Sequence, residues 1–301
     1  EAAGEQRKEP QASWGSLDES AYAPGICSMR YHHSMPPFSF QVAREFISAP
    51  RLEPYLQEVG YENEELALEL YHWSTELEGA FHATLSFVEI TLRNAIDREL
   101  KRWNSEVSSS EWTRHGVTRS QVREIAGKAI KLARDYAQKE LDRKSENQNI
   151  TPHHDQIIAQ LTFGNLTFFF KDPGKTASKE RENIRDEIWE KSLKNAFPDL
   201  NRAAGSRICE IEDGRQKLGR SLEHLRRLRN RVAHHDNLLK VKIRDEINVI
   251  NSVLSKMHPD LPGFAMYKSQ LRRLRREDPR RYIFYRRKGC LSYLSGRASE
   301  I

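Results

Sequence analysis

An all-α bundle is the fold class that the sequence predicts. Apolar residues recur at spacings of three and four along several stretches, and no stretch of useful length alternates apolar and polar residues as a strand would. The chain also lacks an internal repeat. With 301 residues, of which 38% are hydrophobic, it can bury a core in one large domain or two small ones.

The first helices are predicted from periodicity. Residues 1–36 contain scattered Pro, Gly and Ser without an apolar period, so they indicate a flexible leader. A helical pattern begins near Phe40. Its clearest part is residues 75–102, where a single apolar stripe predicts a long core helix, and residues 120–141 predict an amphipathic, highly charged helix.

The middle of the chain is less regular. Residues 155–170 are apolar enough for one buried helix, with Asp155 as its candidate N-cap, although Phe168-Phe169-Phe170 leaves a strand open. Residues 178–195 predict another charged helix, which Pro198 ends. Leucines then form a stripe over residues 218–232, and isoleucines form one over residues 243–257.

Several classes of protein are excluded by what the sequence lacks. No run of about 18 apolar residues occurs, and the first residues lack the basic-then-apolar order of a signal peptide, so we expect no membrane partner and a cytoplasmic location. Cys27, Cys209 and Cys290 are odd in number and far apart, which argues for free thiols over disulfides or zinc. We expect no metal and no cofactor, since phosphate-loop, dinucleotide and Ser-His-Asp patterns are absent.

Positive charge is concentrated in two places. The net charge is +6, but residues 268–301 carry 11 Lys and Arg against three carboxylates, which leaves the rest of the chain slightly negative. Residues 215–231 hold seven Lys and Arg, with Glu223 as the only acidic residue. Such patches attract polyanions in a salt-dependent way. A solvated helix face is the alternative interpretation.

The most informative motif places an Arg-Asn pair and a His-His pair in one leucine-striped segment, Arg229-Asn230-Arg231-Val232-Ala233-His234-His235. Arg229 can hold a phosphate in a planar, always-charged fork, and His234 can exchange a proton near neutral pH. A metal-independent ribonuclease needs both abilities. The Arg–His spacing alone is expected about once by chance, so the surrounding residues supply the specificity.

This motif resembles the Arg-Asn-x-x-x-His signature of the HEPN superfamily, and more closely the Arg-Asn-x-x-Ala-His-His form of Abi-like (abortive infection) bacterial proteins. Residues 51–96 look like the amino-terminal half of that family, and residues 157–170 look like its middle element. The resemblance covers roughly residues 40–258 and implies a HEPN-like helical bundle. We therefore expect this domain over residues 37–260, with the flexible leader before it and a basic, aromatic carboxy-terminal arm over residues 261–301.

The resemblance also implies a chemistry, in which the 2′-hydroxyl of RNA attacks its own phosphodiester and leaves a 2′,3′-cyclic phosphate and a 5′-hydroxyl. His234 would act as general base or acid, and Arg229 would stabilise charge on the phosphorane oxygens. Asn230 would orient His234 or the phosphate. His235 would support the site. The alternatives are that Asn230 is a helix-interior amide and that His235 is only a capping or core residue.

Helix geometry tests this site. Asn230 and His234 lie one turn apart, whereas Arg229 and His234 differ by about 140° around a helix. The length of Arg229, a distortion near Val232-Ala233, or a second copy could bring the two groups together. The resemblance implies a homodimer in which two such helices pair across a two-fold axis, giving one cleft with both motifs.

Two other polar groups have competing interpretations. Glu89 and Arg93 are four residues apart and can form a structural salt bridge, but by the resemblance their helix packs near the motif helix, so Glu89, Arg93 and Asn94 could support the cleft. His153-His154-Asp155 echoes His234-His235-Asp236. Adjacent histidines on a helix point about 100° apart, which argues against a shared metal ion.

The expected RNA contacts come from two segments. Charge that follows the backbone and rings that stack on bases suit single-stranded RNA. The alternative for the arm is an amphipathic segment that docks on the bundle. The residues in question are Arg226, Arg227 and Arg231 in the motif helix, and Arg280, Arg281, Tyr282, Tyr285, Arg286 and Arg287 in the arm.

Two function classes remain open. The first is a metal-independent endoribonuclease toxin of a bacterial phage-defence or toxin–antitoxin system, restrained by an antitoxin protein or a small structured RNA. The second is a non-catalytic RNA-binding module in a defence ribonucleoprotein or an antitoxin-regulated complex. The state of RNA after incubation with the protein in excess chelator distinguishes them.

Overall fold

The computed structural model describes residues 39–144, 150–171, 178–200 and 211–281, and these are helical or connect helices, with no strand among them. This confirms the all-α prediction. The expected leader, residues 1–36, lies outside the described residues, as do residues 282–301 of the arm and all three cysteines. None of the described helices is both long and apolar enough to cross a bilayer.

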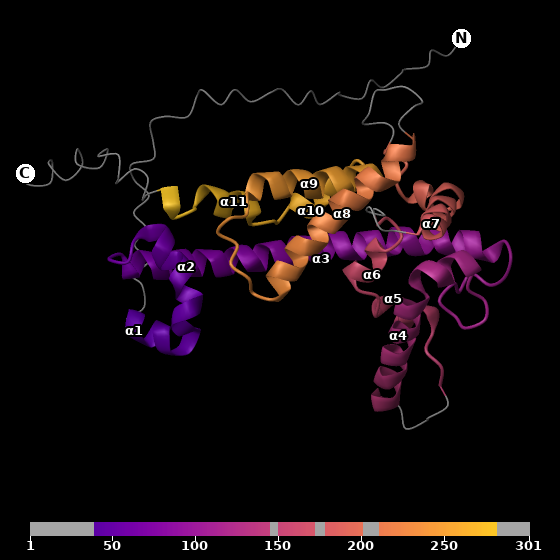
Figure 1. Cartoon of the computed structure of the whole chain (residues 1–301), viewed down its shortest axis with the longest axis horizontal. Helices are drawn as coiled ribbons and strands as arrows, with labels where there is room; N and C mark the ends of the chain where they lie inside the picture. Colours follow the sequence, from indigo (N-terminus) through magenta and orange to yellow (C-terminus); the bar gives the residue numbers. More distant parts are fainter. Residues whose placement is uncertain (1–38, 145–149, 172–177, 201–210, 282–301) are drawn as a thin grey trace, which may run out of the picture.

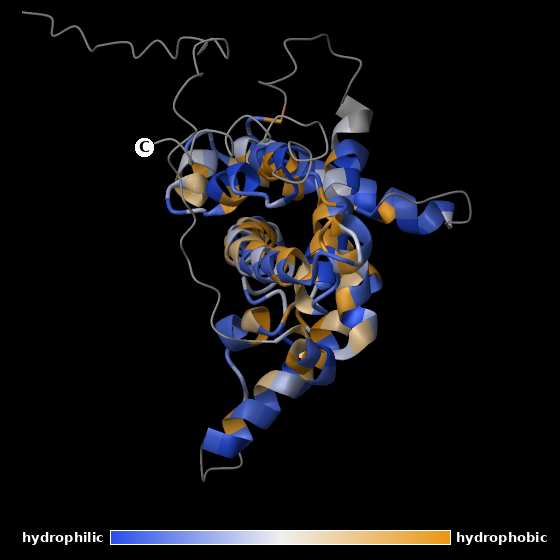
Figure 2. Cartoon of the chain, turned by 90° about the vertical axis from the view of Figure 1, so that its left-hand side faces the viewer, coloured by the Kyte–Doolittle hydropathy of each residue, from blue (hydrophilic) through white to orange (hydrophobic). Residues whose placement is uncertain are grey.

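A single long helix organises the molecule. Helix α3, Glu64–Ser105, has 42 residues and runs along the whole length of the body in Figure 1, a span of about 63 Å. It includes the predicted core helix and begins about three turns earlier. Its stripe of Leu77, Phe81, Leu85 and Leu92 is fully or almost fully buried. Figure 2 looks along α3 and shows the hydrophobic faces of the surrounding helices turned toward one another.

One end of α3 is covered by the first helices. Helix α1, Phe40–Ala43, leads through a π-helical turn, Arg44–Ser48, into α2, Ala49–Val59, which packs on α3. The Tyr55 hydroxyl donates to Ser74 Oγ at 3.1 Å inside this contact. Figure 1 shows these helices at the opposite end of α3 from α4 to α7.

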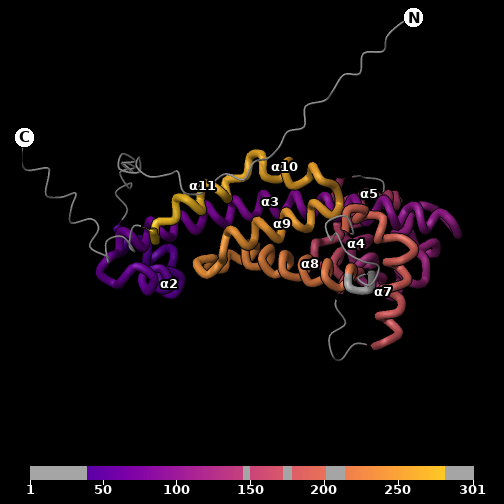
Figure 3. The backbone as a smooth tube through the Cα atoms, turned by 90° about the horizontal axis from the view of Figure 1, so that it is seen from above, coloured from indigo at the N-terminus to yellow at the C-terminus, as the bar shows by residue number. Residues whose placement is uncertain are grey.

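Four helices cover α3 along its middle. Helix α8, Ile211–Ala233, crosses α3 obliquely. Helix α9, Ile243–Met257, comes next in the chain and lies beside α3 (Figures 1 and 3). Helices α10, Leu261–Met266, and α11, Leu271–Arg276, pack on α3 and α9. Leu271 and Leu274 are buried in the common core, so this first part of the expected arm belongs to the helical body.

The remaining helices gather at the other end of α3. They are α4, Ser120–Lys144, α5, His154–Ala159, α6, Phe163–Thr167, and α7, Lys179–Lys191, followed by a 3-10 turn, Leu193–Ala196. The single helix expected over residues 155–170 is therefore wrong, because the chain breaks between α5 and α6. The Thr162 hydroxyl accepts from Asn165 N at 3.3 Å and the Asn165 side chain accepts from Thr162 N at 3.0 Å, a capping box that starts a new helix. Asp155 is not the N-cap of α5, which is His153.

Candidate functional site

The Arg-Asn/His-His motif occupies the end of α8. Leu222, Leu225 and Leu228 bury one face of this helix, which leaves Arg229 and Asn230 half-buried and His234 exposed directly after the last helical residue. The His234 ring has no hydrogen-bond partner among the described residues. Its imidazole is therefore open to a ligand.

His235 occupies a special backbone position. Asp236 N donates to Arg231 O at 2.8 Å and His235 N donates to Val232 O at 3.1 Å, which together form a Schellman motif. His235 has φ 53°, a left-handed conformation usually given to glycine. Its carbonyl accepts from Arg51 at 2.8 Å, and its Nδ1 lies 3.2 Å from a Glu78 carboxylate oxygen.

The helix stays regular up to His234, whose N–H donates to Asn230 O at 2.9 Å. A distortion near Val232-Ala233, one of the three ways to align the motif, is therefore not present. The chain reverses only after His234, so Arg229 and His234 keep their separation of about 140° around α8.

A shared carboxylate connects α8 with α3. Arg93 Nη2 donates to Glu89 Oε1 at 3.2 Å and to Leu161 O at 2.8 Å, and Glu89 Oε2 lies 3.7 Å from Arg229 Nε. The Glu89 side chain is 14% exposed and the Arg229 side chain 38%. Glu89, Arg93 and Arg229 are thus brought together, with part of the Arg229 side chain exposed. Asn94 is exposed, and among the described residues its side chain has no hydrogen bond to any of the three.

The predicted basic patch on α8 is divided by the structure. Arg226 makes two hydrogen bonds of 2.7 Å to Glu223, and Arg227 makes one of 3.1 Å. The bond from Arg226 holds the pKa of Glu223 below its usual value. Arg231 donates to the Asn237 carbonyl. Arg215, which the sequence placed in the patch, is instead buried against Glu182 and Asp186.

The described residues of the arm have different environments. Arg280 donates to Asp278 and, at 2.6 Å, to Leu239 O, and its guanidinium lies 5.4 Å from the Trp73 ring. These contacts favour the docking interpretation for Arg280. Arg281 is exposed. Tyr282, Tyr285, Arg286 and Arg287 lie outside the described residues.

The second His-His-Asp sequence has a structural role at the far end of α3. Buried His154 lies 2.7 Å from Asp97 through Nε2 and 2.8 Å from Thr113 through Nδ1, and Trp112 Nε1 donates to Asp97 at 2.8 Å. Burial alone would raise the pKa of Asp97, but the hydrogen bonds from His154, Lys101 and Trp112 together hold it below its usual value. In the described part of the chain, no three His, Cys, Asp or Glu side chains are arranged to hold a metal.

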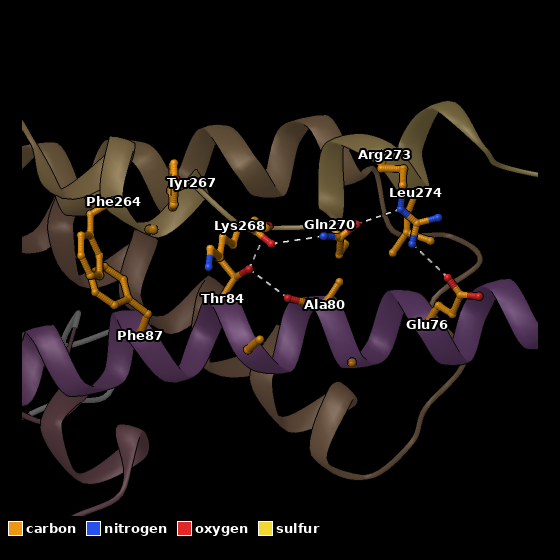
Figure 4. Close-up of a pocket in the computed structure, with 14 residues that line it drawn as sticks. Glu76, Ala80, Thr84, Phe87, Phe264, Tyr267, Lys268, Gln270, Arg273 and Leu274 are labelled. Atoms are coloured by element: carbon orange, nitrogen blue, oxygen red, sulfur yellow. Dashed lines mark hydrogen bonds and ion pairs between the residues drawn. The ribbon is translucent and has the colours of Figure 1, made fainter.

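A groove between α3 and the α10–α11 segment forms a separate concavity of about 530 Å³. Figure 4 shows Phe264 over Phe87, with ring centroids 5.1 Å apart, and the ion pair between Arg273 and Glu76 at the other end. The floor is made of small α3 residues such as Gly79 and Ala80. No residue of the Arg-Asn/His-His motif lines this groove.

Comparison with known proteins gives a family. No curated protein and no solved structure matches the chain. A family model described as Abi-like protein matches residues 45–240, more than half of the chain, from the turn before α2 through the end of the α8 motif. The match confirms the resemblance to Abi-like proteins that the motif indicated. The chain therefore belongs to the Abi-like protein family, whose name connects it with abortive infection and phage defence.

Proposed function

We propose that this chain is a metal-independent endoribonuclease of the HEPN type that acts in phage defence. The observation that carries the proposal is the end of α8, where a mostly buried Glu89 restrains the partly exposed Arg229 and the exposed His234 presents a free imidazole five residues later. An oriented guanidinium and a titratable ring at the surface suit phosphodiester chemistry.

The reaction requires no group beyond the chain and RNA. A His234 imidazole accepts the proton of a ribose 2′-hydroxyl as that oxygen attacks the adjacent phosphorus. The bond from phosphorus to the 5′-oxygen breaks, and the leaving oxygen takes a proton from a protonated His234 ring. Arg229 donates hydrogen bonds to the non-bridging oxygens as they gain charge. Asn230, one turn before His234, orients the ring or the phosphate.

Because α8 is regular up to its end, we propose that the active site is formed by two copies of the chain. Because Arg229 and His234 point about 140° apart on one helix, two α8 ends related by a two-fold axis would complete each other. His234 of one protomer would then face Arg229 of its partner. Light scattering at micromolar concentration should show a dimer, and an active monomer would contradict this arrangement.

The decisive experiment incubates purified protein with single-stranded RNA in excess chelator. Arg229→Ala and His234→Ala should each slow cleavage about a hundredfold or more, the usual scale for lost oxyanion or acid–base support. His153→Ala is the matched control, because His153 is exposed and lies at the start of α5. The products should end in a 2′,3′-cyclic phosphate and a 5′-hydroxyl.

The alternative function is a non-catalytic RNA-binding module, and the same variants separate it. If RNA stays intact with and without divalent ions, and Arg229→Ala loses RNA binding, then the end of α8 binds RNA without cleaving it and the endoribonuclease proposal is wrong. In either case we propose that an antitoxin protein or a small structured RNA restrains the chain in the cell.

A further inference from the structure

A basic cavity of about 550 Å³ lies between α8 and residues 164–171, which comprise most of α6 and the turn after it and are called the α6 segment below. We propose that this cavity is a nucleotide pocket that holds single-stranded RNA beside the phosphate bound at Arg229, an inference that rests on the proposed endoribonuclease function. Its volume is in the usual range for small-molecule sites. The side chains that carry the argument are Asn165, Phe168, Lys171, Arg220, Arg226 and Arg227.

Charge in the cavity favours an anion. Among the described residues, four cationic side chains line the cavity, Lys171, Arg220, Arg226 and Arg227, and one carboxylate does, Glu223. Both Arg226 and Arg227 hydrogen-bond to that carboxylate, so its charge is already compensated and their guanidinium groups are held in place. Among the described residues that line this concave surface, cationic side chains therefore outnumber carboxylates by four to one. A phosphate group is the RNA component that such a site attracts.

An aromatic ring and an amide complete the chemistry for a base. Phe168 lines the cavity and is 39% exposed, so its ring is available for stacking on a single-stranded base. Asn165 uses its carbonyl oxygen in the Thr162 capping box, whereas its Nδ2 has no partner among the described residues. That amide can donate to the edge of a base.

The cavity is built on a rigid contact. A Cβ added to Gly219 would lie 1.9 Å from Phe170 O, so α8 touches the backbone of the Phe168–Phe170 turn directly. On the other side, a Cβ on Gly164 would lie 3.7 Å from Arg226 Cδ. The two walls are therefore fixed against each other before a ligand arrives, which reduces the ordering that binding would require.

The pocket adjoins the candidate site through two connections. Along α8, Arg226 precedes Arg229 by three residues, a rise of about 4.5 Å and nearly one turn. Across the molecule, Leu161 O, shortly before the α6 segment, accepts from Arg93, which shares Glu89 with Arg229. A strand whose phosphate lies at Arg229 can therefore place its neighbouring nucleotide in the cavity.

The test measures binding of a fluorescent, single-stranded 2′-O-methyl oligoribonucleotide, which cannot be cleaved, by anisotropy with the full chain. Phe168→Ala should weaken binding about tenfold, the scale of one lost stacked base, and Phe168→Trp should keep it. Lys171→Ala should weaken binding and flatten its salt dependence. Phe46→Ala is the control, since Phe46 is 79% exposed and belongs to the turn between α1 and α2, and these helices cover the other end of α3 from α6 (Figure 1).

The outcomes separate this inference from the proposed function. If the wild-type protein cleaves RNA but Phe168→Ala binds the probe as tightly as wild type, the nucleotide-pocket inference is wrong and the endoribonuclease proposal stands. Wild-type protein that neither binds nor cleaves single strands would overturn both. Should Phe168→Ala fail to fold, 4-thiouridine crosslinking to wild-type protein decides, because the adduct must lie within residues 164–171 or 219–227.

Discussion

Glu89 Oε2 of α3 lies 3.7 Å from Arg229 Nε of α8, while the other oxygen of the same carboxylate accepts from Arg93 at 3.2 Å. One mostly buried carboxylate thus restrains two arginines from different directions. Charges in a partly buried position interact more strongly than charges in water. Arg229 is therefore oriented before a phosphate arrives, and its side chain has less freedom left to lose on binding.

Glu89→Gln tests this orientation. The amide keeps an acceptor for Arg93 but loses the charge that holds Arg229, so we expect kcat for RNA cleavage to fall about tenfold. KM should stay level or fall, because a negative charge near the bound phosphate is removed. The control is Glu76→Gln, whose side chain is 60% exposed and pairs with Arg273. A rise in KM at unchanged kcat would contradict an orienting role.

The left-handed backbone at His235 gives a prediction about stability. His235→Gly and His235→Ala both remove the contact with Glu78, so the difference between them isolates the backbone. With φ at 53°, the Gly variant should be more stable than the Ala variant by about 1 kcal/mol, measured by urea denaturation. Retained RNA cleavage in His235→Gly would assign His235 to the helix end alone, and lost cleavage would make it part of the chemistry.

Periodicity predicted some helices closely. The isoleucine stripe indicated residues 243–257, and α9 spans Ile243–Met257, because one uninterrupted apolar face decides where that helix can pack. Residues 155–170 were different. Their apolar composition hides the break between α5 and α6, since a local bond between Thr162 and Asn165 caps the start of a new helix. Composition does not register such a single side-chain contact.

The candidate site was predictable to the same partial extent. Arg229 and His234 are recognisable because they lie within one helical segment. The contact of Glu89 with Arg229 joins residues 140 positions apart, and only the crossing of α3 and α8 brings it about. The basic cavity depends on the backbone contact between Gly219 and Phe170. The one local signal of this contact in the sequence was Gly219 itself, because a glycine inside a predicted helix can mark the close approach of another backbone segment.

Gly219→Ala should therefore destabilise the fold. Its new methyl group would meet a backbone carbonyl oxygen that cannot move aside as a side chain end would, so we expect a loss of about 2–3 kcal/mol or more in the free energy of unfolding. Gly79→Ala is the matched control, because nothing lies within 4 Å of a Cβ there. That change should be neutral or stabilise α3 by up to about 1 kcal/mol. Equal behaviour of the two variants in thermal denaturation would contradict the close contact.

The Asp97 network predicts how stability depends on pH. The hydrogen bonds from His154, Lys101 and Trp112 outweigh burial and lower the pKa of Asp97 from its ordinary value of 3.8. A carboxyl whose folded pKa is depressed contributes stability above its unfolded pKa, and that contribution is lost as the pH falls through the folded value. The contribution of Asp97 is thus fully present at neutral pH and disappears below about pH 4.

Asp97→Asn should accordingly lower the free energy of unfolding by about 2 kcal/mol at pH 7, the scale of hydrogen bonds to a charged group. In urea denaturation, the gap between wild type and variant should begin to narrow as the pH falls below 3.8, where the carboxyl of the unfolded chain takes up a proton, and it should close as the pH falls through the lower pKa of folded Asp97. Asp155→Asn is the control, since Asp155 pairs with the same Lys101 but its side chain is 88% exposed, and it should cost less than about 0.5 kcal/mol. A gap that stays constant between pH 7 and pH 3 would show that Asp97 acts through its shape and not through its charge.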